Sequence, residues 1–190
     1  MYFSKLFKAR ILGLFCVYLL TAHFADSKDL LFEAIINGDV KKVKQALKGK
    51  ASVQSRLHGS SPLHLAAYYG RLEIAKLLLS KGADINDRDL GKENPDWRPI
   101  HYAIMNKKSK TAIFLMKMGA DLNAQSKDGL TPLHFSSATE LMDVTEELIK
   151  RRANLNLKTN RGLTPLDLAR TTKIKSALIL AGAKLGKDVK

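Results

Sequence analysis

Three histidines are the residues whose type and spacing first suggest chemistry in this chain. His64, His101 and His134 recur in one short phrase, 37 and 33 residues apart, and neutral imidazole is a common zinc ligand. A zinc ion needs its ligand nitrogens within about 2.1 Å, whereas equivalent positions on stacked helices lie about 8–10 Å apart. The three imidazoles therefore cannot share one ion, and we expect no metal site.

The remaining residues form no familiar catalytic arrangement. The sequence has no glycine-rich phosphate loop, no His-Glu-x-x-His motif and no nucleophile elbow. Glu146 and Glu147 are adjacent, so they point to different sides of a helix, and Asp87 and Asp89 belong to a turn. The lone cysteine, Cys16, lies in an N-terminal apolar run that we expect to be removed. We therefore predict a protein that is not an enzyme and needs no cofactor.

A four-residue phrase repeats along the chain, and its prolines lie 37, 33 and 33 residues apart. A period near 33 indicates one supersecondary unit stacked on copies of itself, with function on the surface of the stack. The four copies are Ser61-Pro62-Leu63-His64, Arg98-Pro99-Ile100-His101, Thr131-Pro132-Leu133-His134 and Thr164-Pro165-Leu166-Asp167.

Each phrase is typical of the start of a helix. A Ser or Thr before proline is an N-cap followed by a proline at the first helical position, where its missing N–H is harmless. Apolar residues follow at helical spacing, first around Leu63 and Ala66 and then around Ile74 and Leu78, and Gly82 is placed to close the second helix in a left-handed conformation. The sequence therefore predicts an all-α repeat solenoid of about five units, each a helix, a turn, a helix and a hairpin-like loop.

A second phrase strengthens the repeat and carries a family resemblance. Gly82-Ala83-Asp84-Ile85-Asn86 returns at residues 119–123 and, less faithfully, at 152–156. Together the two phrases resemble the ankyrin repeat family over roughly residues 28–185. The resemblance implies a protein-binding module, and histidines that hydrogen-bond to the cap hydroxyl and to neighbouring backbone. It assigns structural roles to the repeated residues Pro62, His64, Pro99, His101, Pro132, His134 and Pro165.

The spacing of the repeats also divides the chain into predicted segments. Residues 26–57 lack the proline and histidine of the phrase and are predicted to form an N-terminal capping repeat, and residues 58–185 hold repeats 2 to 5, giving one continuous domain over 28–185. Asp167 replaces histidine in the last copy, as in a terminal repeat that faces water, so we expect both ends of the stack to be sealed. Residues 186–190 are predicted to be a basic tail.

The first 25 residues have the layout of a secretory signal peptide. Lys5, Lys8 and Arg10 precede an apolar run at residues 11–20, which is too short to cross a bilayer as a helix. We predict cleavage after Ala25, with Ala22 as the competing site and an uncleaved N-terminal anchor as the alternative. The mature protein would be periplasmic or secreted, would have no transmembrane segment, and would lack cysteine, which suits an oxidising compartment such as a bacterial periplasm.

The chain is strongly basic, with 32 Lys and Arg against 18 Asp and Glu and a formal charge of +14. Many of the lysines fall on the predicted second helices and at their ends. Such residues usually keep a surface soluble and favour helix C-termini, so we expect no specific nucleic acid binding. The alternative is weak contact with an anionic surface, through a charge-driven association that salt would weaken.

A candidate binding surface surrounds the longer spacing between the second and third repeats. About four extra residues fall within residues 89–97, next to Trp97, the only tryptophan, and tryptophan is enriched among residues that dominate interfaces. Packing beneath a longer loop is the alternative role for Trp97, and helix-end packing for the tyrosines. The candidate residues are Trp97, Tyr68, Tyr69, Met105 and Asn106 on the concave face, with the basic residues Arg88, Lys92 and Arg98 at its rim.

The sequence thus predicts an exported, monomeric, non-catalytic module that binds another protein through its concave face and finger loops. Two alternatives belong to other classes. One is a basic adaptor for anionic surfaces or polyanions, and the other is an envelope immunity or accessory protein for a neighbouring enzyme or toxin.

Overall fold

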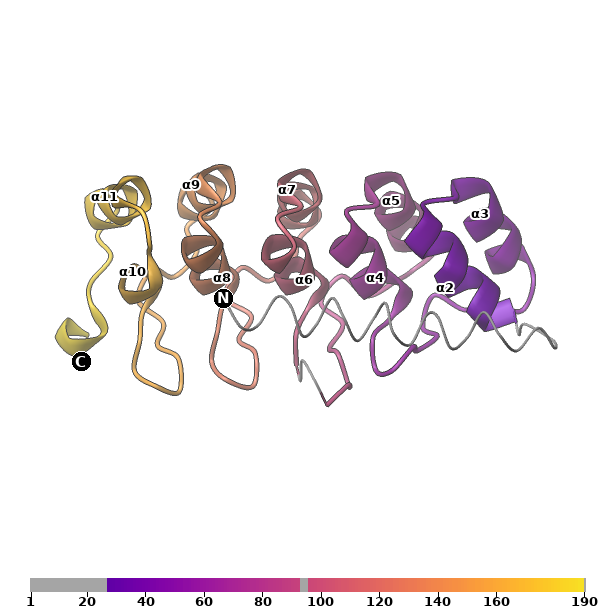
Figure 1. The fold of residues 1–190 in the computed structure, drawn as a ribbon, viewed down its shortest axis with the longest axis horizontal. Helices are drawn as coiled ribbons and strands as arrows, with labels where there is room; N and C mark the ends of the chain where they lie inside the picture. Colours follow the sequence, from indigo (N-terminus) through magenta and orange to yellow (C-terminus); the bar gives the residue numbers. More distant parts are fainter. Residues whose placement is uncertain (1–26, 93–95, 190) are drawn as a thin grey trace.

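The computed structural model describes residues 27–92 and 96–189, so the predicted signal peptide lies outside the described residues. Within the described ranges the protein is all-helical and contains five helix pairs stacked side by side (Figure 1). The elements are α2 (Ser27–Asn37), α3 (Val40–Lys48), α4 (Pro62–Tyr69), α5 (Leu72–Ser80), α6 (Pro99–Met105), α7 (Ser109–Lys117), α8 (Pro132–Thr139), α9 (Met142–Lys150), α10 (Pro165–Leu168), α11 (Thr172–Leu180) and the 3-10 helix η1 (Gly186–Asp188).

The pairs form two layers. The inner helices α2, α4, α6, α8 and α10 lie beneath the outer helices α3, α5, α7, α9 and α11 in Figure 1. Loops that we call fingers join each outer helix to the next inner helix and project below the inner layer. The chain is therefore the all-α repeat solenoid predicted from the period of 33.

Four inner helices begin where the repeated phrase predicts. Pro62, Pro99, Pro132 and Pro165 are each the first residue of an inner helix. The preceding residue is extended in every case, which leaves it free to cap the helix. The proline phrase is thus a start signal that the fold uses four times.

The core runs along the stack between the two layers. Leu63, Ile100 and Leu133 are fully buried at one equivalent inner-helix position, and Ala66 and Ala103 are fully buried beside them. Small alanines allow neighbouring helices to approach, and the larger aliphatic side chains fill the layer between repeats. No repeat buries its apolar face alone, so the stability of each depends on its neighbours.

The residues predicted to be a basic tail begin with η1, which contacts the last repeat. Gly186 is buried, and its N–H donates to the Asp167 carboxylate at 2.8 Å. The carboxylate also accepts from the Thr164 N–H and hydroxyl, both at 2.8 Å. Asp167 therefore takes over the capping role of the histidine that it replaces and fastens η1 to repeat 5.

Within residues 27–92 and 96–189, no helix combines the length and the apolar character that crossing a bilayer requires. The N-terminal apolar run lies outside these ranges.

Candidate functional site

Five aromatic side chains form a continuous row across repeats 2, 3 and 4. Ring centroids are 4.9 Å apart for Tyr69 and Tyr68, 6.3 Å for Tyr68 and Tyr102, 5.4 Å for Tyr102 and Trp97, and 4.8 Å for Trp97 and Phe135. Each pair meets edge to face, with interplanar angles between 60° and 69°, an arrangement that aromatic quadrupoles favour. We call these five residues the aromatic row.

The row has a buried base and a half-exposed surface. Tyr102 and Phe135 are each only 4% exposed, whereas Tyr68, Tyr69 and Trp97 are half-buried. Burial raises the pKa of both Tyr68 and Tyr69, so their hydroxyls stay protonated at neutral pH. The half-buried members offer a large apolar area together with polar hydroxyl groups, which is a combination that protein interfaces use.

The backbone of Trp97 is held at two points. Its carbonyl oxygen accepts a hydrogen bond from the Asp89 N–H at 2.8 Å and lies 3.0 Å from His64 Nε2. Trp97 is thus half-buried, and it packs against the core.

A buried carboxylate anchors the longer finger that leads to Trp97. Asp89 is 3% exposed, and it accepts hydrogen bonds from the hydroxyls of Ser60 and Tyr102 and from the Gly91 N–H. The Leu90 N–H donates to the carbonyl of Gly59 in the preceding finger, at 3.1 Å. These contacts join the inserted segment to repeat 2 on one side and to the aromatic row on the other.

Only part of the predicted basic rim lies on the surface. Arg88 is exposed and forms an ion pair with Asp96 at 3.3 Å, and Lys92 is exposed. Arg98 is different, because its guanidinium donates to the Asn86 carbonyl and its Nε is buried. Arg98 is half-buried, and its guanidinium is held at the base of the finger.

Met105 and Asn106 lie at the C-terminal end of α6, the helix that carries Tyr102. Met105 is half-buried and packs against the core. Asn106 caps the C-terminus of α6 and donates from Nδ2 to the Tyr102 carbonyl at 2.9 Å. Their side chains thus support the helix end beneath the row.

The three recurring histidines bridge successive repeats. In each, Nδ1 accepts the backbone N–H of the residue before the proline, at 3.0–3.1 Å. The Nε2 atoms of His64, His101 and His134 face backbone carbonyls farther along the chain, at 3.0, 3.0 and 3.1 Å. These are the hydrogen bonds to neighbouring backbone that the family resemblance implies, and cap hydroxyls lie 2.8 Å from Nδ1 of His64 and His134.

Burial keeps these imidazoles uncharged. It lowers the pKa of His64 and of His134, and it lowers the pKa of His101 from the usual 6.5 to about 3. Among the residues that the structure describes, no group of three or more His, Cys, Asp or Glu could hold a metal ion. The histidines are structural groups of the repeat.

Comparison with known proteins agrees with this architecture along most of the chain. A family model of ankyrin repeats (3 copies) matches residues 7–89, and models of ankyrin repeats (many copies) match residues 63–116 and 117–169. Protein phosphatase 1 regulatory subunit 27 of Mus musculus and of Homo sapiens is 35% identical over 107 residues, which cover 55% of this chain and 67% of each relative. This chain belongs to the ankyrin repeat family.

A further ankyrin relative shares only one portion of its length with this chain. Ankyrin repeat domain-containing protein 13C of Danio rerio is 28% identical over 111 residues, which cover 58% of this chain and 22% of the relative. Ankyrin repeats indicate a protein–protein interaction module, and proteins built from them are generally non-catalytic.

Two members of the aromatic row were missed in the sequence analysis of this ankyrin repeat protein. Tyr102 and Phe135 each follow the recurring histidine directly, at the position that Leu65 and Leu168 occupy in repeats 2 and 5. The change from leucine to an aromatic residue in two adjacent repeats was a usable signal. Because neighbouring repeats stack, aromatic residues at one equivalent position must lie near each other.

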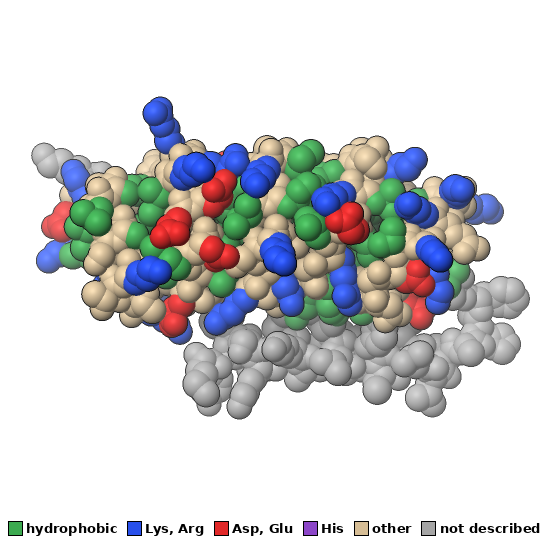
Figure 2. Space-filling model, turned by 90° about the horizontal axis from the view of Figure 1, so that it is seen from above, with side chains coloured by type: hydrophobic (Ala, Val, Ile, Leu, Met, Phe, Trp, Pro, Cys, Tyr) green, Lys and Arg blue, Asp and Glu red, His purple; other side chains and the backbone are tan. Residues whose placement is uncertain are grey.

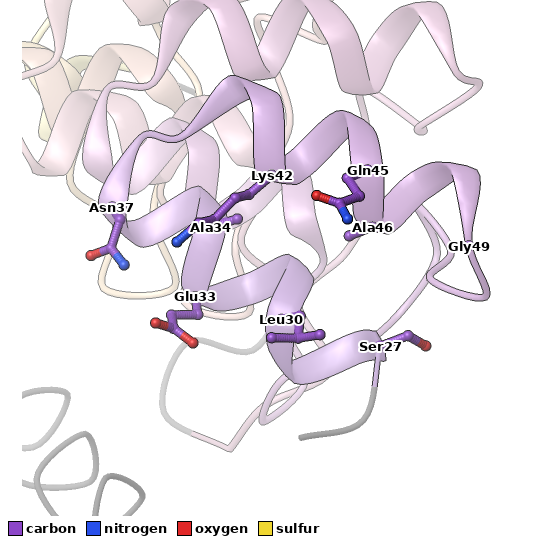
Figure 3. Close-up of a pocket in the computed structure, with 9 residues that line it drawn as sticks. All are labelled: Ser27, Leu30, Glu33, Ala34, Asn37, Lys42, Gln45, Ala46 and Gly49. Carbon is purple, nitrogen blue, oxygen red and sulfur yellow. The ribbon is translucent and has the colours of Figure 1, made fainter. Parts of the chain in front are cut away.

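The first described repeat of the ankyrin stack has a groove on its surface. A groove of about 480 Å³ lies between α2 and α3 (Figure 3). Leu30 lines it and is 50% exposed, so the first repeat does not seal the end with polar side chains alone. The groove is lined by Ser27, Leu30, Glu33, Ala34, Asn37, Lys42, Gln45, Ala46 and Gly49.

Proposed function

We propose that this chain is an exported, monomeric protein-binding module whose partner docks against the aromatic row and the finger of repeat 3. The observation that carries the proposal is the row itself, which presents Tyr68, Tyr69 and Trp97 half-exposed above a rigid, buried base. Aromatic side chains that are fixed before binding lose little conformational entropy in a complex. Regulation of the partner by binding is part of the proposal, because two relatives are named as regulatory subunits.

The charges around the row support a partner that binds mainly by shape. The inner helices α4, α6 and α8 contain no Lys, Arg, Asp or Glu. Exposed charges lie instead on the neighbouring finger, where Arg88 is already paired with Asp96. An aromatic centre with a polar rim is the usual anatomy of a specific protein interface.

Export is the second part of the proposal, and the basic and apolar pattern of the first 25 residues supports it. The test is to express the full chain in a Gram-negative host and to compare the N-terminal sequence and the location of the product. Recovery in the periplasm or medium, beginning near residue 26 or 23, is expected. Recovery of the protein from the cytoplasm with an intact N-terminus would refute export and would leave the binding proposal unaffected.

The binding site is tested by affinity capture with matched variants. Tyr69→Ala combined with Trp97→Ala should abolish capture of the proteins that the wild-type chain retains, and circular dichroism should still report a folded helical domain. Phe114→Ala is the control, since Phe114 is a half-buried aromatic residue on the outer helix α7. Equal capture by the double variant and the wild type would refute the aromatic row as the binding surface.

A further inference from the structure

The net positive charge of this protein is concentrated on one side of the fold. We define the outer layer as the outer helices with the turns that flank them, residues 38–50, 70–82, 106–119, 140–152 and 170–182. These segments hold 18 Lys and Arg against six Asp and Glu. The five inner helices hold one Lys against three Asp and Glu. Solubility alone favours charges of both signs spread over every face. It therefore does not explain this separation of charge, whereas binding to a negatively charged partner would.

The acidic residues of the outer layer are themselves unevenly placed. Four of the six belong to repeat 4, as Glu140, Asp143, Glu146 and Glu147, and Glu147 is paired with Arg151. The outer segments of repeats 1, 3 and 5 hold twelve Lys and Arg against the single Asp39. Figure 2 views this layer from above and shows Lys and Arg side chains along its whole length, with green apolar patches between them.

The cations are densest along one edge, which we call the basic edge. It consists of the turns that close the five outer helices, at residues 48–50, 80–82, 117–119, 150–152 and 180–182, and equivalent turns of successive repeats line up along the stack. The edge carries seven Lys and Arg and no Asp or Glu. Lys81, Lys117 and Lys150 are exposed, and their ammonium groups make no hydrogen bond or ion pair with the described residues, although the charges of Lys117 and Lys150 act on Glu147 nearby.

Exposed aliphatic side chains lie among these cations. Met118, next to Lys117, is 54% exposed. Leu180, in the last turn of the basic edge, is 88% exposed, and Ile179 next to it is 59% exposed. They are among the most exposed large apolar side chains of the described residues. Lysines flanking exposed aliphatic groups are the combination that binds at a membrane interface, where head groups attract the cations and the boundary of the acyl chains takes up the apolar groups.

We propose that the outer layer docks, through its basic edge, on a bilayer that contains anionic phospholipids. Nucleic acid fits this layer less well. Fourteen of the 18 cations are lysines rather than arginines, and Phe114 is the only aromatic residue of the layer, so it lacks the stacking platforms and guanidinium forks that nucleic acids use. Because the aromatic row lies on the inner helices and a finger, a membrane-docked protein could still hold a partner on the opposite side.

Vesicle binding by the full chain tests the proposal. The wild type should bind vesicles of phosphatidylcholine mixed with phosphatidylglycerol, should ignore phosphatidylcholine alone, and should dissociate as salt rises. The triple variant Lys81→Gln, Lys117→Gln and Lys150→Gln should bind more weakly by on the order of a hundredfold, since each lysine near an anionic surface contributes about fivefold. Circular dichroism checks that the variant is folded.

A control triple with the same loss of charge separates position from net charge. Lys127→Gln, Arg161→Gln and Lys187→Gln lie on exposed positions away from the outer layer and should leave vesicle binding unchanged. Met118→Ser with Leu180→Ser should reduce the binding that persists at moderate salt. Three results would each overturn the proposal: an equal loss of vesicle binding in both triple variants, no loss of vesicle binding in the first triple variant, or capture of duplex DNA without capture of vesicles. All variants carry the same N-terminal segment, so any contribution from it cancels.

Discussion

The Nε2 atom of His64 lies 3.0 Å from the carbonyl oxygen of Trp97, and the two residues belong to consecutive repeats. Because Nδ1 accepts the Ser61 N–H at 3.1 Å, the proton of the neutral imidazole is on Nε2, which donates to that carbonyl. One histidine therefore fixes the start of its own helix and the end of the longer finger at the same time. Protonating such a histidine would remove an acceptor that the helix start needs.

The first prediction concerns pH. Burial lowers the pKa of His101 in the folded protein to about 3, whereas the unfolded chain keeps about 6.5. The unfolded state therefore binds the proton first, and stability that is complete above pH 6.5 is lost as the pH falls toward 3. Between pH 7 and pH 5 this residue alone should lower the free energy of unfolding by about 2 kcal/mol.

Urea unfolding at several pH values measures this slope. His101→Gln removes the titrating group and should flatten the dependence on pH, whatever it does to stability at pH 7. His58→Gln, on an exposed part of a finger, is the matched control. An unchanged slope in the His101 variant would contradict the assignment.

The second prediction concerns the start of α6. Arg98 occupies the N-cap and has no side-chain acceptor, whereas the equivalent Thr131 accepts from the His134 N–H at 3.4 Å. Arg98→Thr should raise the free energy of unfolding by about 1 kcal/mol, and Thr131→Ala should lower it by about the same amount. Thermal unfolding measures both. No gain in stability in Arg98→Thr would contradict this prediction. It would mean that losing the hydrogen bond from Arg98 to the Asn86 carbonyl costs as much as the new cap contributes.

Pro62 and Asp89 illustrate why the repeats could be predicted from the sequence and the longer finger could not. Pro62 and its equivalents act locally, since a cap followed by proline starts a helix in any context, and the period of 33 then places the copies. Asp89 lies where the later fingers have Ser126 and Thr159, and like them it accepts from the N–H two residues on. Its carboxylate also contacts Ser60 and Tyr102, which are 29 and 13 residues away in sequence. No periodicity signals contacts that occur once.

The same reasoning applies to the residues proposed for binding. Tyr68, Tyr69 and Trp97 were predicted because they are large, rare or placed at variable positions. The direction of Arg98 depends on a carbonyl twelve residues earlier, at Asn86, which composition and spacing do not reveal. Likewise, the packing of Gly186 depends on a carboxylate that replaces the usual histidine in the last repeat alone.

The third prediction tests the anchor of the longer finger. Tyr102→Phe removes a hydroxyl that donates to the buried Asp89 carboxylate and should lower the free energy of unfolding by about 2 kcal/mol, as expected for a hydrogen bond to a charged group. Trp97 is the only tryptophan and packs against Tyr102, so its fluorescence reports the transition directly. Tyr69→Phe removes a half-buried hydroxyl of the same row and should change little. Equal effects of the two variants would rule out a special role for the Asp89 contact.

The fourth prediction uses two helix ends with the same backbone conformation. Glu140 closes α8 with φ 65° and ψ 30°, and Gly70 closes α4 with φ 69° and ψ 31°. This left-handed region strains any residue with a Cβ and is open to glycine. Glu140→Gly should therefore raise the free energy of unfolding by up to about 1 kcal/mol, and it also removes one of the few acidic residues of the outer layer.

The reciprocal substitution sharpens this test. Gly70→Ala would place a Cβ in the strained region, 2.8 Å from Cδ of Lys108. The lysine side chain can move aside, so most of the loss, again about 1 kcal/mol, comes from the backbone. Thermal unfolding of both variants should show shifts of opposite sign. If Glu140→Gly lowers the melting temperature instead, the glutamate side chain must stabilise repeat 4 by more than the strained backbone at Glu140 destabilises it. The four acidic residues of that repeat would then have a structural reason to differ from the rest of the basic outer layer.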